Sequence, residues 1–379
     1  MAITLLGAAL LYLIVRMIPA PVPPVNPLLE ARRAMYESIL PDARVREREV
    51  ALARAAALRA PLAYEPFFLA ARAREQRGDW RGAVALMSEV RRRRASFVPA
   101  RLQLAAYYGM TNRFTEMFAE IDVALRLNTD VRQAMVVELT RLIAMPDGRS
   151  ALAAALARNP EWRKDFFDAA MTRQIAPPDA LALLNLVRAA NPRGNHGLEL
   201  RLYLNSMVGA GQVARARSLW LNRLPADLRE RSRLLFDGGF TGARTMPPFG
   251  WRLYQSEAGR AELVRDERPY LEIDYFGGSN EILVEQVIAL TPGAYRLSFS
   301  ARSDEGVGDA DLQWALFCHP GDANVVRAPI AQLTANWQRR STSFVVPAGC
   351  TGQRLRLIAQ PGDISVPVTF AIAGLEIAR

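Results

Sequence analysis

The spacing of apolar residues changes once along the chain, near residue 235. Before that point apolar residues recur every three to four positions, and short breaks of Gly, Asn and Pro interrupt them. Two such stripes are Ala83, Leu86, Met87 and Val90, and Phe114, Phe118, Ile121 and Leu125. Because this period puts apolar side chains on one side of a helix, it predicts amphipathic helices over residues 28–235.

The helical region contains a repeat with a period of 34 residues. The Gly-Asp-Trp turn at 78–80 aligns with Asn-Arg-Phe at 112–114, and a further copy of the turn appears at 211–216. In period and in turn, residues 50–230 resemble tetratricopeptide repeats. The resemblance implies an α-helical solenoid that binds partner proteins, here proteins of the cell envelope.

Residues 236–379 follow a different pattern, in which apolar and polar residues alternate over short stretches. Such stretches are 271–275, 296–302 and 353–357. Turn residues such as Pro292-Gly293 separate them. Because alternation places one face of a strand in a core, and about eight to ten strands fit this length, we expect an antiparallel β-sandwich.

The β-region resembles the galactose-binding-like jelly roll of carbohydrate-binding modules. It opens with Phe-Asp-Gly-Gly-Phe at 236–240, followed by Pro-Pro-Phe-Gly-Trp at 247–251. The hairpin at 290–295 and the Asn336-Trp337 pair also fit that family. The resemblance covers nearly all of the β-region. It implies a jelly roll that contacts glycan, and acidic polysaccharide is among the ligands we consider.

One position departs from that family. Its modules often carry a Glu after the opening motif, where the carboxylate helps to hold a structural calcium ion, but this chain has Thr241. Asp237 is the only carboxylate left to the motif. We therefore expect no cofactor, and only Asp237 argues for a structural calcium ion.

Aromatic rings that face solvent would be the glycan contacts. Trp314 alternates in phase with Leu312 and Leu316, so we place it in the core. Trp251 and Trp337 occupy positions that usually pack in the related modules. The exposed candidates for glycan contact are Tyr254, Tyr270 and Phe276. Since aromatic residues are ordinary strand formers, a purely structural role is the alternative for each.

The chain has two cysteines, Cys318 and Cys350, and both lie in the β-region. A jelly roll can bring the end of the strand at 312–318 close to the loop before residue 353, so we expect a Cys318–Cys350 disulfide. The alternative is a pair of separate thiols in a cytosolic protein. Two cysteines and two histidines exclude a cysteine-rich scaffold and a multi-histidine metal centre.

The first 18 residues are almost entirely apolar and precede a proline-rich run at 19–27. This pattern predicts a membrane anchor at 1–18 and an extended linker at 19–27. The alternative is a buried N-terminal helix of a soluble protein. The cysteine pair favours an oxidising compartment, whereas arginines beyond the linker favour a cytoplasmic body. We expect a single-pass inner-membrane protein whose C-terminal body lies in the periplasm.

All of the excess in the net charge of +10 belongs to the helical region. Residues 1–235 contain 35 basic and 22 acidic residues, whereas residues 236–379 contain 13 and 16. One basic cluster is formed by Arg91, Arg92, Arg93 and Arg94, at the end of a predicted helix. It could meet anionic lipid or acidic polysaccharide; the alternative is a solvated helix end that complements the helix dipole. We expect no nucleic-acid partner.

Recognisable catalytic motifs are absent. The sequence has no G-x-S-x-G elbow, no phosphate-binding glycine loop and no H-E-x-x-H. Glu272 and Asp274 alternate with apolar residues, which places them on the solvated side of a strand. The strongest enzyme hypothesis is a polysaccharide lyase, in which Asn195, His196 and Tyr203 would neutralise a uronate and move a proton. The alternative for residues 191–197 is a plain turn between helices.

We therefore expect a non-enzymatic, membrane-anchored envelope scaffold without catalytic or metal-binding residues. Its helical repeats would bind partner proteins, and its β-sandwich would contact glycan or protein. This arrangement resembles proteins encoded with bacterial exopolysaccharide synthesis and export machinery. The alternatives are a scaffold that binds only proteins, and a lyase with a helical toroid plus a β-sandwich.

Overall fold

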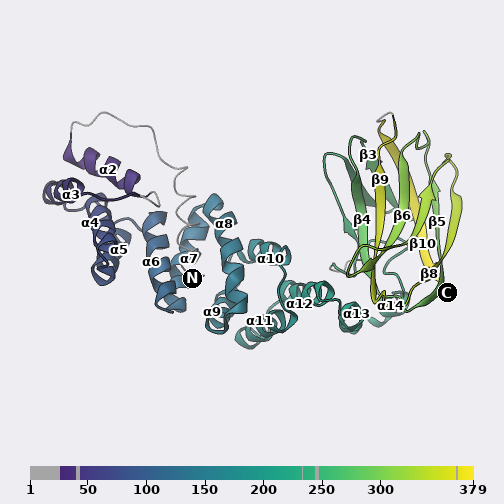
Figure 1. The fold of residues 1–379 in the computed structure, drawn as a ribbon, viewed down its shortest axis with the longest axis horizontal. Helices are drawn as coiled ribbons and strands as arrows, with labels where there is room; N and C mark the ends of the chain where they lie inside the picture. Colours follow the sequence, from purple (N-terminus) through teal and green to yellow (C-terminus); the bar gives the residue numbers. More distant parts are fainter. Residues whose placement is uncertain (1–25, 40–42, 233, 244–246, 364–365) are drawn as a thin grey trace. The chain divides into compact units, whose positions relative to one another are not determined.

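The computed structural model describes residues 26–379, with gaps at 40–42, 233, 244–246 and 364–365. It shows a helical region followed by a two-sheet antiparallel β-sandwich, as the apolar spacing predicts (Figure 1). The chain divides into two compact units, Met1–Glu199 and Leu200–Arg379. The boundary falls within a helix, so the second unit contains the last helices together with the sandwich.

The described part of the first unit is built of short helices joined by tight turns. In chain order they are α2 (Pro27–Ser38), α3 (Glu47–Arg59), α4 (Glu65–Gln76), α5 (Trp80–Arg93), α6 (Val98–Met110), α7 (Phe114–Leu127), α8 (Thr129–Leu139), the 3₁₀ helix η2 (Thr140–Ala144), α9 (Pro146–Leu156), α10 (Arg163–Met171) and α11 (Pro177–Ala190). Helix α12 (Gly197–Gly209) contains the unit boundary, and α13 (Val213–Leu221) and α14 (Ala226–Arg231) follow it.

The period of 34 residues corresponds to a repeated turn. Gly78, Asn112 and Gly211 all have a left-handed backbone, with φ of 78°, 56° and 76°. In each turn the next residue donates its backbone N–H to the carbonyl five residues earlier, at 2.9, 2.8 and 2.9 Å. Glycine and asparagine suit this conformation because larger side chains crowd the backbone there. The turns join α4 to α5, α6 to α7 and α12 to α13, so the sequence repeat is a helix-turn-helix repeat.

The apolar stripes form the interior of the first unit. Met87 and Val90 of α5 are buried, as are Phe118 and Ile121 of α7. Leu86 is only half-buried, so the stripe on α5 is narrower than its spacing predicts. Burial of these stripes against neighbouring helices is what makes such short helices stable, since isolated helices of this length are marginal in water.

Helices α12 and α13 pack against the sandwich inside the second unit. The Trp220 ring contacts the rings of Phe236 and Phe249, with ring centres 5.4 and 5.5 Å apart. His319 donates a hydrogen bond from Nε2 to the carbonyl of Val208 at 2.9 Å; a carbonyl can only accept, which fixes the proton on Nε2. This helical pair therefore belongs to the same packed body as the strands.

The sandwich consists of two five-stranded antiparallel sheets, with orders β1-β4-β9-β6-β7 and β2-β3-β10-β5-β8 (Figure 1). The strands are β1 (Arg252–Leu253), β2 (Gly259–Val264), β3 (Tyr270–Tyr275), β4 (Glu281–Ile288), β5 (Gly293–Arg302), β6 (Asp311–His319), β7 (Asn324–Ile330), β8 (Gln338–Val346), β9 (Gly352–Gln360) and β10 (Val368–Ala378). The sheets enclose one apolar core, and the arrangement is a jelly roll.

Two fully buried glutamines complete the backbone hydrogen bonding of this body. The Gln286 side chain accepts from the N–H of Phe236 and donates to its carbonyl, both at 3.0 Å. Gln353 does the same for Leu290, at 2.7 and 3.3 Å. A buried backbone group without a hydrogen-bond partner is costly. The two side-chain amides supply these partners to Phe236 and Leu290, which lie outside the strands.

The expected membrane anchor and most of the expected linker, residues 1–25, lie outside the described residues; Pro27 begins α2. Within the part of the chain that the structure describes, no helix is both long and apolar enough to cross a bilayer. The expectation of a single-pass inner-membrane protein is therefore wrong for the described chain. The Cys318–Cys350 disulfide fits an extracellular or periplasmic location.

Candidate binding faces of the β-sandwich

Alternation along the strands sends every second side chain of each sheet away from the core. We name the two outward surfaces by one strand of each sheet. The β4 face comprises Arg252, Tyr254, Glu285, Gln313, Ala315, Phe317, Arg327, Arg354 and Arg356. The β3 face comprises Tyr270, Glu272, Arg302, Trp337, Arg339, Ala371 and Ala373, with Arg268 at its edge.

A charged row crosses the β4 face. Strand pairing aligns Arg252 of β1 with Glu285 of β4, and Glu285 with Arg356 of β9, and the row continues across β6 and β7. Glu285 is only 8% exposed. Its Oε2 accepts a hydrogen bond from Arg356 Nε at 2.7 Å and lies 3.9 Å from Arg354 Nη1. These partners offset the cost of burying the carboxylate.

Two aromatic rings flank this row. The guanidinium of Arg252 lies 5.0 Å from the centre of the Tyr254 ring, and that of Arg356 lies 5.5 Å from the centre of the Phe317 ring. The register places Phe317 two residues to one side of the row and Tyr254 two residues to the other. Strand spacing then places the Cα atoms of these two residues about 20 Å apart.

Further polar groups belong to this face. Gln313 lies on the outward side yet is only 4% exposed, and its Nε2 donates to Asp311 Oδ2 at 3.0 Å. Burial raises the pKa of Tyr254, and Glu285 adds to the rise while the nearby arginines oppose it. The phenol is therefore protonated at neutral pH and can donate a hydrogen bond. The β4 face offers donors and acceptors beside two rings, as ligand sites generally do.

The β3 face carries a cluster of two rings and two arginines. The Tyr270 and Trp337 rings meet edge to face, with centres 6.0 Å apart. The guanidinium carbons of Arg268 and Arg302 lie 4.6 and 5.2 Å from the centre of the Trp337 ring, and Arg302 is 5.9 Å from that of Tyr270. All three distances are within the range of cation–π attraction.

The remaining predicted aromatic positions differ in outcome. Phe276 is 45% exposed just beyond β3. The core position of Trp314 is confirmed, since its side chain is inaccessible. Trp251 is half-buried and donates from Nε1 to the carbonyl of Asp237 at 3.0 Å. Trp337, expected to pack inside, is instead half-buried on the β3 face. A tryptophan one residue before a strand has no alternation of its own to reveal its side.

Asp237 closes its own loop. Its carboxylate accepts hydrogen bonds from the backbone of residues 241–243, at 2.9 to 3.1 Å, and from the Thr241 hydroxyl at 2.7 Å. These four bonds use the acceptor capacity that a calcium ion would need. Among the residues that the structure describes, no group of three or more His, Cys, Asp or Glu side chains could hold a metal ion.

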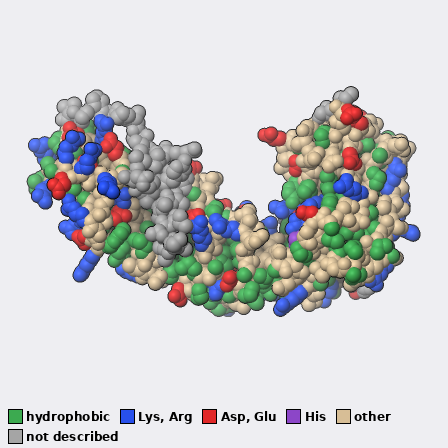
Figure 2. Space-filling view, viewed as in Figure 1, with side chains coloured by type: hydrophobic (Ala, Val, Ile, Leu, Met, Phe, Trp, Pro, Cys, Tyr) green, Lys and Arg blue, Asp and Glu red, His purple; other side chains and the backbone are tan. Residues whose placement is uncertain are grey.

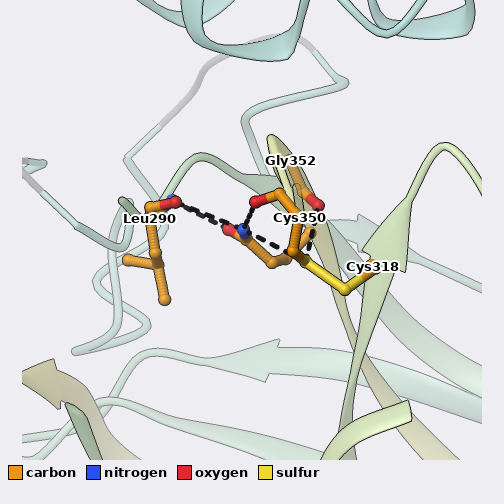
Figure 3. Close-up of a disulfide and its surroundings, with 5 residues drawn as sticks. Leu290, Cys318, Cys350 and Gly352 are labelled. Atoms are coloured by element: carbon orange, nitrogen blue, oxygen red, sulfur yellow. Dashed lines mark hydrogen bonds between the residues drawn. A yellow bond between two sulfur atoms is a disulfide. The ribbon is translucent and has the colours of Figure 1, made fainter. Parts of the chain in front are cut away.

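The predicted disulfide is confirmed. Cys318, near the end of β6, is bonded to Cys350, in the loop before β9, with the two Cα atoms 5.3 Å apart (Figure 3). The Gln353 side chain donates to the carbonyl of Cys350 at 2.8 Å as well as to that of Leu290 (Figure 3). The disulfide therefore lies in a network that joins β6 and β9, the central strands of the β4 face.

The arginine cluster of the helical unit is largely paired with carboxylates. Arg91 binds Glu120, and Arg92 and Arg93 both bind Glu89. Arg93 also lies 3.8 Å from the centre of the Phe67 ring, and Arg94 lies 5.1 Å from that of Tyr64. In the space-filling view, basic and acidic side chains are interspersed over the helical unit (Figure 2).

The residues of the lyase hypothesis lie in or near the turn before α12. The Asn195 side chain accepts from the N–H of Gly197 at 2.9 Å, at the start of α12, and its carbonyl accepts from Arg163. Both ring nitrogens of His196 are buried without a hydrogen-bond partner among the residues that the structure describes, and Tyr203 is buried in the second unit.

The two carboxylates on β3 belong to the strand's outward side. Glu272 is half-buried, and Asp274 accepts from Arg260 Nε and from the Thr369 hydroxyl, both at 2.7 Å. Burial alone would raise the pKa of Asp274, but these two hydrogen bonds outweigh it and lower the pKa below its ordinary value. Asp274 is therefore a paired, ionised group rather than a proton donor.

Comparison with known proteins gives similarity of fold only. No protein-family model matches the chain, and no curated protein matches it. The chain is similar to a family 4 carbohydrate-binding module, at 19% identity over 38% of this chain and 97% of that one, with a TM-score of 0.29. It is similar to a family 16 carbohydrate-binding module, at 18% identity over 39% of this chain and 100% of that one, with a TM-score of 0.28.

A third similar structure is an arabinose-bound α-L-arabinofuranosidase, at 13% identity and a TM-score of 0.29. The match covers 38% of this chain and 26% of the enzyme, so this chain spans about a quarter of the enzyme's length. At these identities and TM-scores, none of the similarities supports a conclusion about ligand or activity. Such a conclusion has to come from the two faces themselves.

Proposed function

We propose that this protein is a non-catalytic glycan-binding protein, and that its β4 face binds the uncharged part of a polysaccharide. The observation that carries the proposal is the pair of rings, Tyr254 and Phe317, on either side of the charged row. Aromatic rings pack against the C–H faces of sugars, and the polar side chains between them reach the hydroxyls.

The charged groups of the row suit hydroxyl recognition. A sugar hydroxyl both donates and accepts, and Glu285 accepts while Arg356 donates. Glu285, Arg356 and Gln313 are buried or half-buried, and each is already held by a neighbouring side chain. Side chains that are fixed before binding lose little entropy when a ligand arrives.

For the helical unit we propose a tetratricopeptide-like role in binding partner proteins. A surface pocket of about 700 Å³ lies between α5, α6 and α7 and is lined by both acidic and basic side chains. Paired charges of both signs favour specific docking of a protein surface over capture of a bare polyanion. In this proposal the polysaccharide is a bacterial cell-surface polymer, and the helices hold the protein to the machinery that makes or exports it.

Affinity electrophoresis of the full-length protein tests the glycan proposal. In gels that contain one neutral polysaccharide each, from a panel of β-glucans, xylan, galactomannan and arabinan, we expect retardation in at least one gel. The variant Tyr254→Ala/Phe317→Ala should lose that retardation while keeping its melting temperature within a few degrees.

Phe276→Ala is the matched control, because Phe276 is an exposed ring just beyond β3, in the sheet opposite the β4 face. It should be retarded like the wild type. Mobility of the wild type that is unchanged across the whole panel, or equal loss in Phe276→Ala, would overturn the proposal.

A further inference from the structure

Arg268 and Arg302, at the β3 face, contact an aromatic ring but, within the described chain, not a carboxylate that would neutralise their charge. Among the described residues, no carboxylate forms an ion pair with Arg268 or Arg302, and neither guanidinium has a hydrogen-bond partner there. Two other arginines of the same sheet do have carboxylate partners: Arg260 binds Asp274 at 2.7 Å and Arg339 lies 3.8 Å from Glu376. What distinguishes Arg268 and Arg302 is that both lie against one aromatic ring, that of Trp337.

Attraction to an aromatic ring has a different consequence from an ion pair. The ring's quadrupole orients a guanidinium and holds it in place, but it leaves the formal charge and the N–H donors available. Trp337 holds both guanidiniums within 5.2 Å of its centre. A guanidinium whose N–H groups remain available can bind a carboxylate with charge-assisted hydrogen bonds, which are about twice as strong as neutral ones.

The neighbouring positions of β10 carry small, buried side chains. Arg302 is aligned across the sheet with Ala371 of β10, and the next residue on that side of β10 is Ala373. Ala371 and Ala373 are only 7% and 1% exposed, so a ligand would meet the rings and guanidiniums of the cluster first. Glu272 of β3 is also aligned with Ala371, so β10 separates its backbone from that of Arg302. A carboxylate brought by a ligand would therefore complete the cluster from outside.

We propose that the β3 face is a second glycan site, in which Arg268 and Arg302 bind the carboxylate of a uronate residue and the sugar ring lies against the outer side of the Tyr270–Trp337 pair. This deepens the proposed function, on which it rests for the class of ligand, by naming an acidic polysaccharide. The charge is recognised on one face and the hydroxyls on the other. Neither face needs the other for its own contacts.

The test is binding of the full-length protein to uronate oligomers by isothermal titration calorimetry, at low and at high NaCl. The probes are oligogalacturonate, oligomannuronate and a hyaluronan oligosaccharide, and methyl-esterified oligogalacturonate is the uncharged match of the first. We expect at least one acidic oligomer to bind more tightly than an uncharged one, with affinity that falls at high salt because exposed charges are screened.

The deciding variant is Arg268→Gln/Arg302→Gln, which keeps a polar, hydrogen-bonding side chain but removes both charges. It should weaken binding of the acidic oligomer by about tenfold or more. Arg339→Gln is the matched control, because it removes an arginine of the same face that already has a carboxylate partner. It should change the affinity less than about twofold.

The outcomes separate this inference from the proposed function. Binding of acidic and esterified oligomers with equal affinity, unchanged in Arg268→Gln/Arg302→Gln, overturns the second site while the β4 face proposal stands. Acidic binding that depends on both arginines but survives Tyr254→Ala/Phe317→Ala supports the second site even if the β4 face fails. Failure of all three acidic oligomers overturns the second site. Equal, arginine-dependent binding of polyglutamate overturns its assignment to a sugar.

Discussion

The two outer faces of the sandwich both combine arginines with aromatic rings, but they commit the arginines differently. On the β4 face, Arg354 and Arg356 converge on Glu285, which lies in the middle of the charged row. On the β3 face, Arg268 and Arg302 rest on Trp337. An ion pair cancels the charge that a surface offers to a ligand, whereas an aromatic ring preserves it. Whether an arginine contacts a carboxylate or an aromatic ring is therefore more informative about the charge of a ligand than the arginine alone.

The helical unit shows the same distinction in its densest basic cluster. Arg91, Arg92 and Arg93 bind carboxylates that lie on α5 and α7. A run of four arginines in the sequence thus becomes mostly a set of paired charges. The pair at the β3 face, far apart in the sequence, is by contrast uncommitted among the described residues.

Removing the disulfide should lower the free energy of unfolding more than any other change, and it should loosen mainly the sheet that carries the β4 face. Cys318→Ala/Cys350→Ala frees two segments that are 32 residues apart, and the chain-entropy relation gives a loss of roughly 3 to 4 kcal/mol in the free energy of unfolding. Urea unfolding measures the total. Hydrogen exchange should rise more in β6 and β9 than in β3 and β5. An equal rise in both sheets would show that the cross-link does not favour the β4 face.

Removing the carboxylate of the charged row should cause the next largest loss in the free energy of unfolding. Glu285→Ala leaves Arg354 and Arg356, both half-buried, without their shared partner, and we expect a loss of about 2 kcal/mol in the free energy of unfolding. Arg302→Gln on the β3 face should cost less, about 0.5 to 1 kcal/mol, because it removes only the contacts with the Trp337 and Tyr270 rings and no ion pair. Equal costs in urea titrations would contradict the difference between the faces.

Much of the fold follows from local patterns. The stripes on α5 and α7 and the 34-residue turn needed only helical periodicity, and alternation along β9 assigned Leu355 and Leu357 to the core. The same alternation already placed Arg354 and Arg356 outward, and Phe317 opposite Trp314. These residues could have been named as surface candidates from the sequence.

The partners of those residues could not be predicted in the same way. Glu285 and Arg356 are 71 residues apart, and they meet only because β4 and β9 are neighbours in the sheet. The cluster at Trp337 draws on the loop before β3, the end of β5 and the start of β8. Sheet order is set by the packing of the whole core, so no local pattern contains it. The sequence therefore predicts Tyr270 as a candidate contact but does not indicate that Trp337, Arg268 and Arg302 lie beside it.

The smallest effect that still separates the faces is a dependence on pH at the end of β6. Burial lowers the pKa of His319, and Arg354 of the β4 face lowers it further, while the hydrogen bond to Val208 and the charges of Asp322 and Glu285 oppose this. The folded protein then holds this proton less tightly than the unfolded chain does. The free energy of unfolding should fall as pH drops below about 6.5, the ordinary value for histidine.

His319→Gln keeps an N–H that can reach the Val208 carbonyl but cannot titrate, so it should flatten the decline in the free energy of unfolding between neutral and mildly acidic pH. Arg302→Gln should leave that decline unchanged, because Arg302 lies on the opposite sheet from His319. If His319→Gln retained the full decline, the titration would belong to another group. If Arg302→Gln removed it, the two faces would be coupled electrostatically, and the separate roles given to their arginines would not hold.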